Sequence, residues 1–230
     1  MTTYPKTEWS KMQKNLQAKI CQDALDYAKI RYIAGVDVAY TKMQNQEYGC
    51  CSIVVLDFHT LKVVDQESYT NKVDVEYLPG FLSFRELPLV LETSKKLKIT
   101  PDVFVFDGNG ILHPRKMGIA THASFYLNKP CIGVAKKFYH SNEIPSFDIP
   151  SDSFGASTNI YNSSSEKVGI ALRSRLHCKP IFVSVGNYMN LNNAKEIILK
   201  CVNKESRIPI PTRLADIETH KLRSQFLQKK

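Results

Sequence analysis

The sequence has no long apolar run and no paired-cysteine motif. No stretch of about 18 apolar residues occurs, so we expect no segment that spans a membrane. None of the six cysteines forms a C-x-x-C pair, which argues against a zinc site. Residues 1–15 are polar and lack the apolar core of a secretory signal. We therefore expect an intracellular protein, cytoplasmic or nuclear, with reduced cysteines.

The length and the charge narrow the class of protein further. A chain of 230 residues suits one α/β domain or two small ones, and the absence of a repeat or linker favours a single domain over residues 1–230. We place the core at about 7–216 and expect the basic, polar residues 217–230 to form a loosely ordered tail. Lys and Arg exceed Asp and Glu by 31 to 22, a net charge of +9. This excess favours a polyanionic partner, which can be nucleic acid, an anionic membrane surface or a phosphorylated substrate.

Hydrophobic periodicity predicts alternating strands and helices. Helices are expected at 7–31, 81–97, 117–127 and 193–202. Strands are expected at 32–40, 48–57, 62–70, 103–106, 131–135, 168–172 and 181–185, with an irregular connection over 138–166. The strand 103–106 ends in Asp107 and a glycine-rich loop, which is the usual place for an active site in an α/β protein.

Four carboxylates occupy positions that suit a metal site. Asp37 lies within an apolar strand, Asp107 ends another, Glu86 lies on a helix and Asp216 is near the C-terminus. Taken alone, each is better explained by exposure to solvent or, for the strand aspartates, by pairing with a lysine. Together they supply the oxygen ligands that Mg²⁺ prefers and that phosphodiester cleavage requires. Their placement favours an α/β fold with a ribonuclease H-like central mixed sheet flanked by helices.

Several motifs, in order along the chain, resemble those of the endonuclease V family. They are Ile33–Val38, Tyr77–Glu86, Asp107–Arg115, Gly118–Ala120, Ile132–Lys137 and Pro209–Asp216. Residues 152–155 and 169–174 look more like the eukaryotic branch of that family, whose members tend to act on inosine in RNA. The resemblance implies cleavage at the second phosphodiester 3′ to inosine, in RNA or DNA, leaving 3′-hydroxyl and 5′-phosphate ends.

The resemblance also assigns roles to individual residues. Asp37, Glu86, Asp107 and Asp216 match metal-binding and catalytic positions for Mg²⁺, with Mn²⁺ as a substitute. Lys136 matches a lysine near the scissile phosphate, although a solvated lysine at a strand end is the alternative. His113 matches an active-site histidine, with a capping or surface histidine as the alternative.

A second group of residues matches the positions that hold the base. Tyr77 would wedge into the strand on a stiff turn made by Pro79 and Gly80, and would replace the stacking lost when the base rotates out. Glu76 stands where many bacterial relatives have proline, so the turn is expected to be less rigid here. The pocket for the base is expected to be lined by Gly80, Leu82, Gly108, Gly118 and Ile119. The alternative is that these are turn glycines and core aliphatics.

One segment departs from the family pattern. Many relatives read Gly-His-Arg where this chain has Gly186-Asn187-Tyr188. We expect this change to weaken a structural hydrogen bond or a phosphate contact while leaving the carboxylates in place. Three other functions remain open: an inosine-binding reader that does not cut, a flap or mismatch nuclease, and a basic scaffold. Nothing in the sequence calls for more than a monomer.

Overall fold

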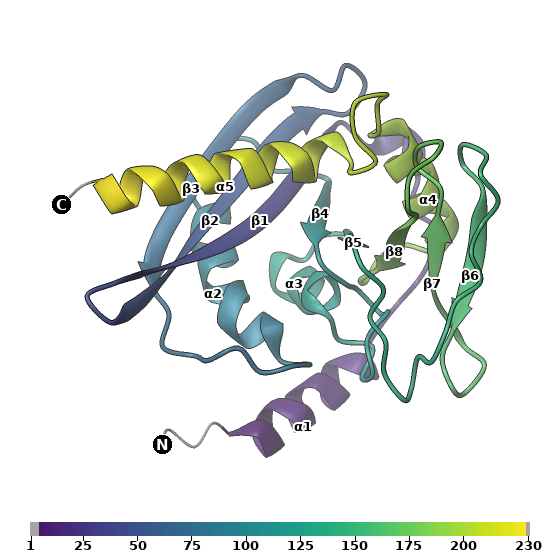
Figure 1. Cartoon of the computed structure of the whole chain (residues 1–230), viewed down its shortest axis with the longest axis horizontal. Helices are drawn as coiled ribbons and strands as arrows, with labels where there is room; N and C mark the ends of the chain where they lie inside the picture. Colours follow the sequence, from purple (N-terminus) through teal and green to yellow (C-terminus); the bar gives the residue numbers. More distant parts are fainter. Residues whose placement is uncertain (1–4, 229–230) are drawn as a thin grey trace.

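A mixed sheet of eight strands forms the centre of the computed structural model, which describes residues 5–228 (Figure 1). The strands are β1 (Tyr32–Met43), β2 (Gln46–Asp57), β3 (Val63–Lys72), β4 (Val103–Asp107), β5 (Cys131–Ala135), β6 (Ser157–Tyr161), β7 (Lys167–Leu172) and β8 (Ile181–Val185). Their order in the sheet is β3-β2-β1-β4-β5-β8-β7-β6. The pairs β1–β4 and β4–β5 are parallel, and the other neighbours are antiparallel.

Helices cover both faces of this sheet. They are α1 (Lys6–Gln17), the short 3₁₀ helix η1 (Tyr27–Lys29), α2 (Leu82–Ser94), α3 (Ile119–Leu127), α4 (Leu191–Lys200) and α5 (Ile210–Gln228). In Figure 1, the long α5 crosses the strands β1 and β2. No helix within residues 5–228 has both the length and the apolar character needed to cross a bilayer. The predicted arrangement of a central mixed sheet flanked by helices is confirmed.

The alternation of side chains along each strand sorts the apolar residues into two cores. Ile33 of β1, with Val103 and Val105 of β4, belongs to the core that contains Ala215 of α5. Ala34 and Val36 of β1 belong to the other core, with residues of α2 and α3. Because the alternation continues along β1 and β4, Asp37 and Asp107 fall on the face that carries α5.

Gly35 allows α5 to approach β1 closely. A Cβ atom at this position would lie 1.9 Å from the carbonyl oxygen of Pro211, which is closer than any real contact. Pro211 itself is compatible with the first turn of a helix, where its missing N–H group is not needed. The glycine two residues before Asp37 therefore determines how near the start of α5 comes to the strand.

Two predictions near the N-terminus and the middle of the chain are wrong. The helix expected over 7–31 ends at Gln17, because residues 21 and 25 are held by contacts with distant segments. The backbone N–H of Cys21 donates to Asn187 and that of Leu25 donates to Asn193, so tertiary contacts override the local helical preference. The connection expected to be irregular contains β6, an edge strand whose side chains are mostly too polar to produce a clear pattern.

The expectation of a loosely ordered tail after Asp216 is also wrong for the described residues. Helix α5 continues to Gln228, and Thr219 is fully buried against β1. The hydroxyl of Thr219 lies 2.6 Å from the carbonyl oxygen of Ala215 and 3.5 Å from that of Asp37. Most residues of this segment are polar because one side of the helix faces solvent, which hid the helix in the sequence. Residues 229–230 lie outside the described part of the chain.

Candidate active site

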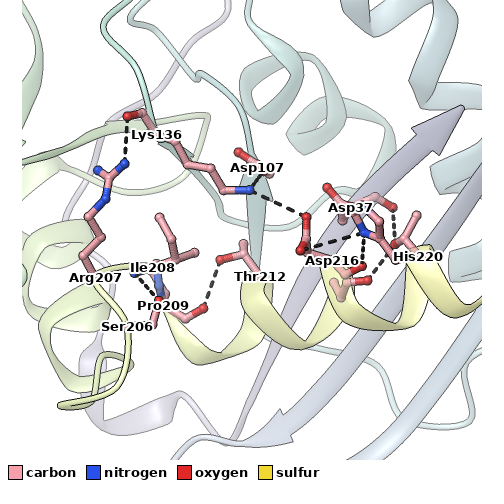
Figure 2. Close-up of polar contacts among 12 residues, drawn as sticks. Asp37, Asp107, Lys136, Ser206, Arg207, Ile208, Pro209, Thr212, Asp216 and His220 are labelled. Carbon is pink, nitrogen blue, oxygen red and sulfur yellow. Dashed lines mark hydrogen bonds and ion pairs between the residues drawn. The ribbon is translucent and has the colours of Figure 1, made fainter. Parts of the chain in front are cut away.

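Three aspartates from separate parts of the chain converge beside the start of α5 (Figure 2). Asp37 comes from β1, Asp107 ends β4 and Asp216 lies on α5. One carboxylate oxygen from each lies within 4.8 Å of the others. The parallel pairing of β1 with β4 places the first two side by side, and the close approach of α5 brings the third. The structure thus brings together three of the four predicted carboxylates.

The charges in this cluster are not balanced by the protein. The Nζ atom of Lys136 lies 2.6 Å from Asp107 and 3.7 Å from Asp216. Burial opposes the charge of Lys136, but these ion pairs prevail and raise its pKa. Burial raises the pKa of Asp37 to about 6, and the charges of Asp107 and Asp216 add to the effect. One lysine facing three carboxylates leaves a site that favours a cation.

The donor set fits a magnesium ion. Mg²⁺ binds oxygen ligands at about 2.1 Å, so two ligands on opposite sides of one ion are about 4.2 Å apart. The carboxylate oxygens of Asp37, Asp107 and Asp216 lie within 4.8 Å of one another, so small side-chain rotations would bring all three into that range. Carboxylate oxygens are also the ligand type that this ion prefers over nitrogen or sulfur.

Glu86, the fourth predicted ligand, lies outside this trio. Its Oε1 accepts a hydrogen bond from the hydroxyl of Tyr40 at 3.1 Å. Burial raises the pKa of Glu86 to about 8, the hydrogen bond from Tyr40 lowers it, and the charge of Asp37 raises it. Glu86 is therefore close enough to interact with the cluster electrostatically, and its role as a ligand stays a prediction.

Most of the predicted base-binding residues line one cavity of about 150 Å³. The predicted residues that line it are Tyr77, Gly80, Leu82, Gly108, Gly118 and Ile119, together with His113. Pro79 is not among the lining residues and is exposed on the adjacent turn. Gly80 has φ of +80°, a conformation that glycine adopts readily. Because Gly108 directly follows Asp107, the cavity and the carboxylate cluster adjoin each other.

His113 is buried and neutral rather than poised to carry a proton. Burial, together with the smaller effect of the charge of Arg115, lowers its pKa to about 3. Its Nδ1 atom accepts hydrogen bonds from the backbone N–H groups of Arg115, at 3.1 Å, and Met117, at 3.4 Å. These contacts hold the loop that forms one wall of the cavity, and the predicted catalytic role of His113 stays a prediction.

Three further residues shape the cavity and were not singled out from the sequence. Gln13 is fully buried, and its Nε2 donates to the carbonyl oxygen of Gly80 at 3.1 Å. Arg115 donates to the same oxygen at 2.7 Å and to Gln13 Oε1 at 2.5 Å. The ring of Tyr139 lines the cavity and stacks on His113 with 6.0 Å between centroids. Only Arg115 lay within a recognised motif, where it could have been noticed.

The departure at residues 187–188 has a structural explanation. Asn187 is buried, its Oδ1 accepts from the N–H of Cys21 at 2.6 Å, and its own N–H donates to Ser124 at 3.0 Å. Tyr188 has φ of +67°, and its N–H donates to the carbonyl oxygen of Cys21 at 2.8 Å. The two residues hold the segment after α1 against the core, so this position serves packing here.

The sequence and the structure both match known proteins. The family model for endonuclease V matches residues 14–217. Endonuclease V of Bacillus thuringiensis is 46% identical over 96% of this chain and 94% of its own length. The crystal structure of endonuclease V from Bacillus subtilis superposes with a TM-score of 0.94 at 42% identity, covering 99% of this chain and 96% of that one. This likeness confirms the ribonuclease H-like fold.

A more distant structure contains a nucleic acid. Endonuclease V of Ciona intestinalis was crystallised with a 24mer DNA containing an inosine followed by a ribo-adenosine. It superposes with a TM-score of 0.83 at 28% identity, covering 96% of this chain and 98% of that one. The identity to the Bacillus subtilis protein is higher, at 42%. These values favour the bacterial branch, against the expectation drawn from residues 152–155 and 169–174.

Proposed function

The chain belongs to the endonuclease V family, and from this membership and its carboxylate cluster we propose that it is a metal-dependent endonuclease directed by inosine. The observation that carries the proposal is the convergence of Asp37, Asp107 and Asp216 next to a cavity for one base. The substrate is a strand of RNA or DNA, and the net charge of +9 suits such a polyanion. The protein acts inside the cell as a monomer.

The base pocket selects the substrate. Tyr77 is 63% exposed at the rim, so its ring is free to stack against the bases that remain in the strand. The rotated hypoxanthine enters the cavity, where backbone groups of Gly80, Gly108 and Gly118 lie close to its edges. Gln13 and Arg115 hold the carbonyl oxygen of Gly80, so the edge of the pocket is fixed before the base arrives.

Cleavage occurs at the adjoining cluster. Mg²⁺ or Mn²⁺ held by Asp37, Asp107 and Asp216, with Glu86 as a further ligand, would supply Lewis-acid activation of the phosphodiester and of water. Lys136 offsets the negative charge that develops on the phosphate. The cut falls at the second linkage 3′ to inosine, which leaves 3′-hydroxyl and 5′-phosphate ends.

The test is cleavage of matched end-labelled strands of RNA and DNA, each with one inosine or none, in Mg²⁺, Mn²⁺ or EDTA. We expect cutting only with a metal ion and only in the strands that contain inosine, and the faster strand identifies the substrate class. The double variant Asp37→Asn, Asp107→Asn should bind the inosine strand and fail to cut it. Asp148→Asn, which changes an exposed carboxylate elsewhere, is the matched control and should cut normally.

Three outcomes would overturn the proposal. Full activity in the double variant would remove the carboxylates from the mechanism. Equal cutting with and without inosine would indicate a nuclease that recognises strand shape. Binding of inosine without cutting in either metal would indicate a reader protein.

A further inference from the structure

A second open surface lies on the loops after β7 and before α5. A hollow of about 580 Å³ opens between residues 174–177, which follow β7, and residues 202–204, which precede α5. We define the distal subsite as its lining residues Phe154, Arg175, Leu176, His177 and Lys204. Phe154 is 59% exposed and Leu176 is 47% exposed. An exposed aromatic ring and an exposed aliphatic side chain thus line the same hollow as two exposed cations.

The charge of the distal subsite is positive. None of the described residues that line the hollow carries a carboxylate. Asp152 pairs with Arg173 at 3.5 Å and contacts His177 at 2.6 Å, whereas Glu205 pairs with Arg213 at 2.9 Å. The unbalanced charge therefore comes from Arg175 and Lys204, which complement a polyanion.

The topology of the sheet places this surface at the same edge as the catalytic cluster. The strands β4, β5 and β7 run in the same direction, since β4 and β5 are parallel and both β5 and β7 are antiparallel to β8. Asp107, which ends β4, and Lys136 and Arg173, which follow β5 and β7, accordingly lie at one edge. Because β7 is two positions from β5, the lateral distance between them is roughly 10 Å.

Arg207 connects the cluster to the distal subsite. Its Nη2 donates to the carbonyl oxygen of Lys136 at 3.2 Å, as Figure 2 shows. The backbone carbonyl oxygen of Arg207 accepts a hydrogen bond from the hydroxyl of Ser174 at 2.6 Å. The Nη1 atom of Arg207 donates to the carbonyl oxygen of Pro180 at 2.9 Å. Through its side chain and its backbone, Arg207 thus connects the loops after β5, after β7 and before α5.

The order of these contacts gives the substrate strand a direction. The base cavity adjoins Asp107, and Asp107 pairs with Lys136. Arg207 contacts both Lys136 and Ser174, and Ser174 lines the same hollow as the distal subsite. Since the proposed cut lies 3′ to the inosine, the nucleotides beyond the cut extend away from the cavity. At about 3.4 Å per nucleotide, the 10 Å between β5 and β7 corresponds to about three nucleotides.

We propose that the distal subsite binds the nucleotides on the 3′ side of the scissile phosphate, with a base stacked on Phe154 and phosphates paired with Arg175 and Lys204. The inference rests on the proposed function for its direction, and on the exposed aromatic ring of Phe154 and the exposed cations Arg175 and Lys204 for its chemistry. An aromatic platform beside basic side chains is the usual way in which proteins hold single strands without reading their sequence.

The experiment compares a triple variant with wild type on a series of substrates. The variant is Phe154→Ala, Arg175→Gln, Lys204→Gln, and the matched control is Tyr161→Ala, Lys95→Gln, Lys98→Gln, which removes one exposed aromatic ring and two exposed cations elsewhere. The inosine strands share one 5′ side and carry from one to about eight nucleotides beyond the cut, a range that includes the smallest sites of about four nucleotides.

For wild type and control, KM should fall as the 3′ side lengthens to about four nucleotides. The triple variant should lose this gain, with a KM about 10-fold higher on long strands, as expected for the loss of one stacked base. On the shortest strand its kcat/KM should equal that of wild type. An equal loss on short and long strands would overturn the proposal. If the KM of the triple variant fell with strand length as much as that of wild type, the proposal would also be overturned. A protein partner would then be the remaining occupant of the hollow.

A binding measurement separates this proposal from the proposed function. Fluorescence anisotropy with an inosine-free single strand of about 12 nucleotides tests the distal subsite even if the protein cuts nothing. Two lost phosphate contacts should make the slope of log affinity against log salt shallower by about 1.4 in the triple variant. An unchanged slope would overturn the distal subsite, whereas absence of inosine-dependent cutting in wild type would overturn only the proposed function.

Discussion

Lys136 shows how much depends on a single cation at the residue scale. Lys136 pairs with the carboxylates of Asp107 and Asp216, and in the proposed mechanism it also contacts the scissile phosphate. Replacing Lys136 with Ala should lower kcat about 100- to 1000-fold, the usual effect of removing one group that stabilises developing charge. Single-turnover cleavage of the inosine strand measures this. The exposed neighbour Lys137→Ala is the control, and a comparable loss in that variant would contradict a specific role for Lys136.

Glu86 should make stability depend on pH. The pKa of Glu86 is about 8 in the folded protein, mainly because of burial, whereas its ordinary value is 4.5. Between these values the folded protein retains a proton that the unfolded chain has released, so this group makes the protein less stable as pH rises. Glu86→Gln should therefore raise Tm relative to wild type at about pH 9 and by much less at about pH 5, in EDTA.

Thermal unfolding across that pH range measures the difference. Glu92→Gln, on the exposed side of the same helix, should show no such gain. A difference between Glu86→Gln and wild type that stays constant with pH would contradict the ionisation argument.

At the residue scale, the sequence motifs predicted the residues of the active site but not the residues that hold the base cavity in shape. Asp37, Asp107, Lys136 and Asp216 were predicted, and the structure brings them together. Gln13 was missed because its importance comes from a hydrogen bond to Gly80, 67 positions away. Contacts of that kind depend on the folded chain and leave no local pattern.

The contact between β1 and α5 is the critical one at the scale of elements. Gly35→Ala would place a Cβ atom against the backbone of Pro211, so the start of α5 has to move. Asp216 would then separate from Asp37. We expect a loss of about 1–3 kcal/mol in the free energy of unfolding, typical of overpacking, and at least a 100-fold loss of cleavage.

Gly49→Ala is the matched control for this prediction. Its Cβ would meet the side-chain atoms of Leu89 and Val73, not the backbone of α5. That variant should lose stability while each folded molecule cuts normally. Chemical denaturation and cleavage corrected for the folded fraction distinguish the two. Normal cleavage by Gly35→Ala would show that the position of α5 is not set by this contact.

The elements that the sequence predicted well are those with a strong local pattern. The strands at 103–106 and 131–135 were found because they are continuous apolar runs buried on both faces. The helix from 210 to 228 was missed because many of its residues are polar, and only one side of it packs against the sheet. Burial on one side of a polar helix depends on what covers it, which a local pattern does not reveal.

At the scale of the whole molecule, a metal ion should stabilise the fold. The carboxylates of Asp37, Asp107 and Asp216 repel one another, and an ion that binds only the folded protein adds to its stability by mass action. Mg²⁺ at 100 times its Kd should add about 2.7 kcal/mol, and EDTA should remove that gain. Scanning calorimetry with and without Mg²⁺ measures it. An equal gain in Asp107→Asn would indicate that the ion binds elsewhere.

The position of Asp216 on α5 also affects when a newly made molecule becomes active. Asp37 of β1 is made before Asp216 of α5, so the cluster cannot form until α5 has been made. Chains are made from the N-terminus, so every copy that ends before residue 216 lacks one of the three aspartates. An incomplete copy would therefore not cut the cell's nucleic acid. Translation halted before residue 210 should release protein without cleavage activity, while full-length product from the same reaction should cut.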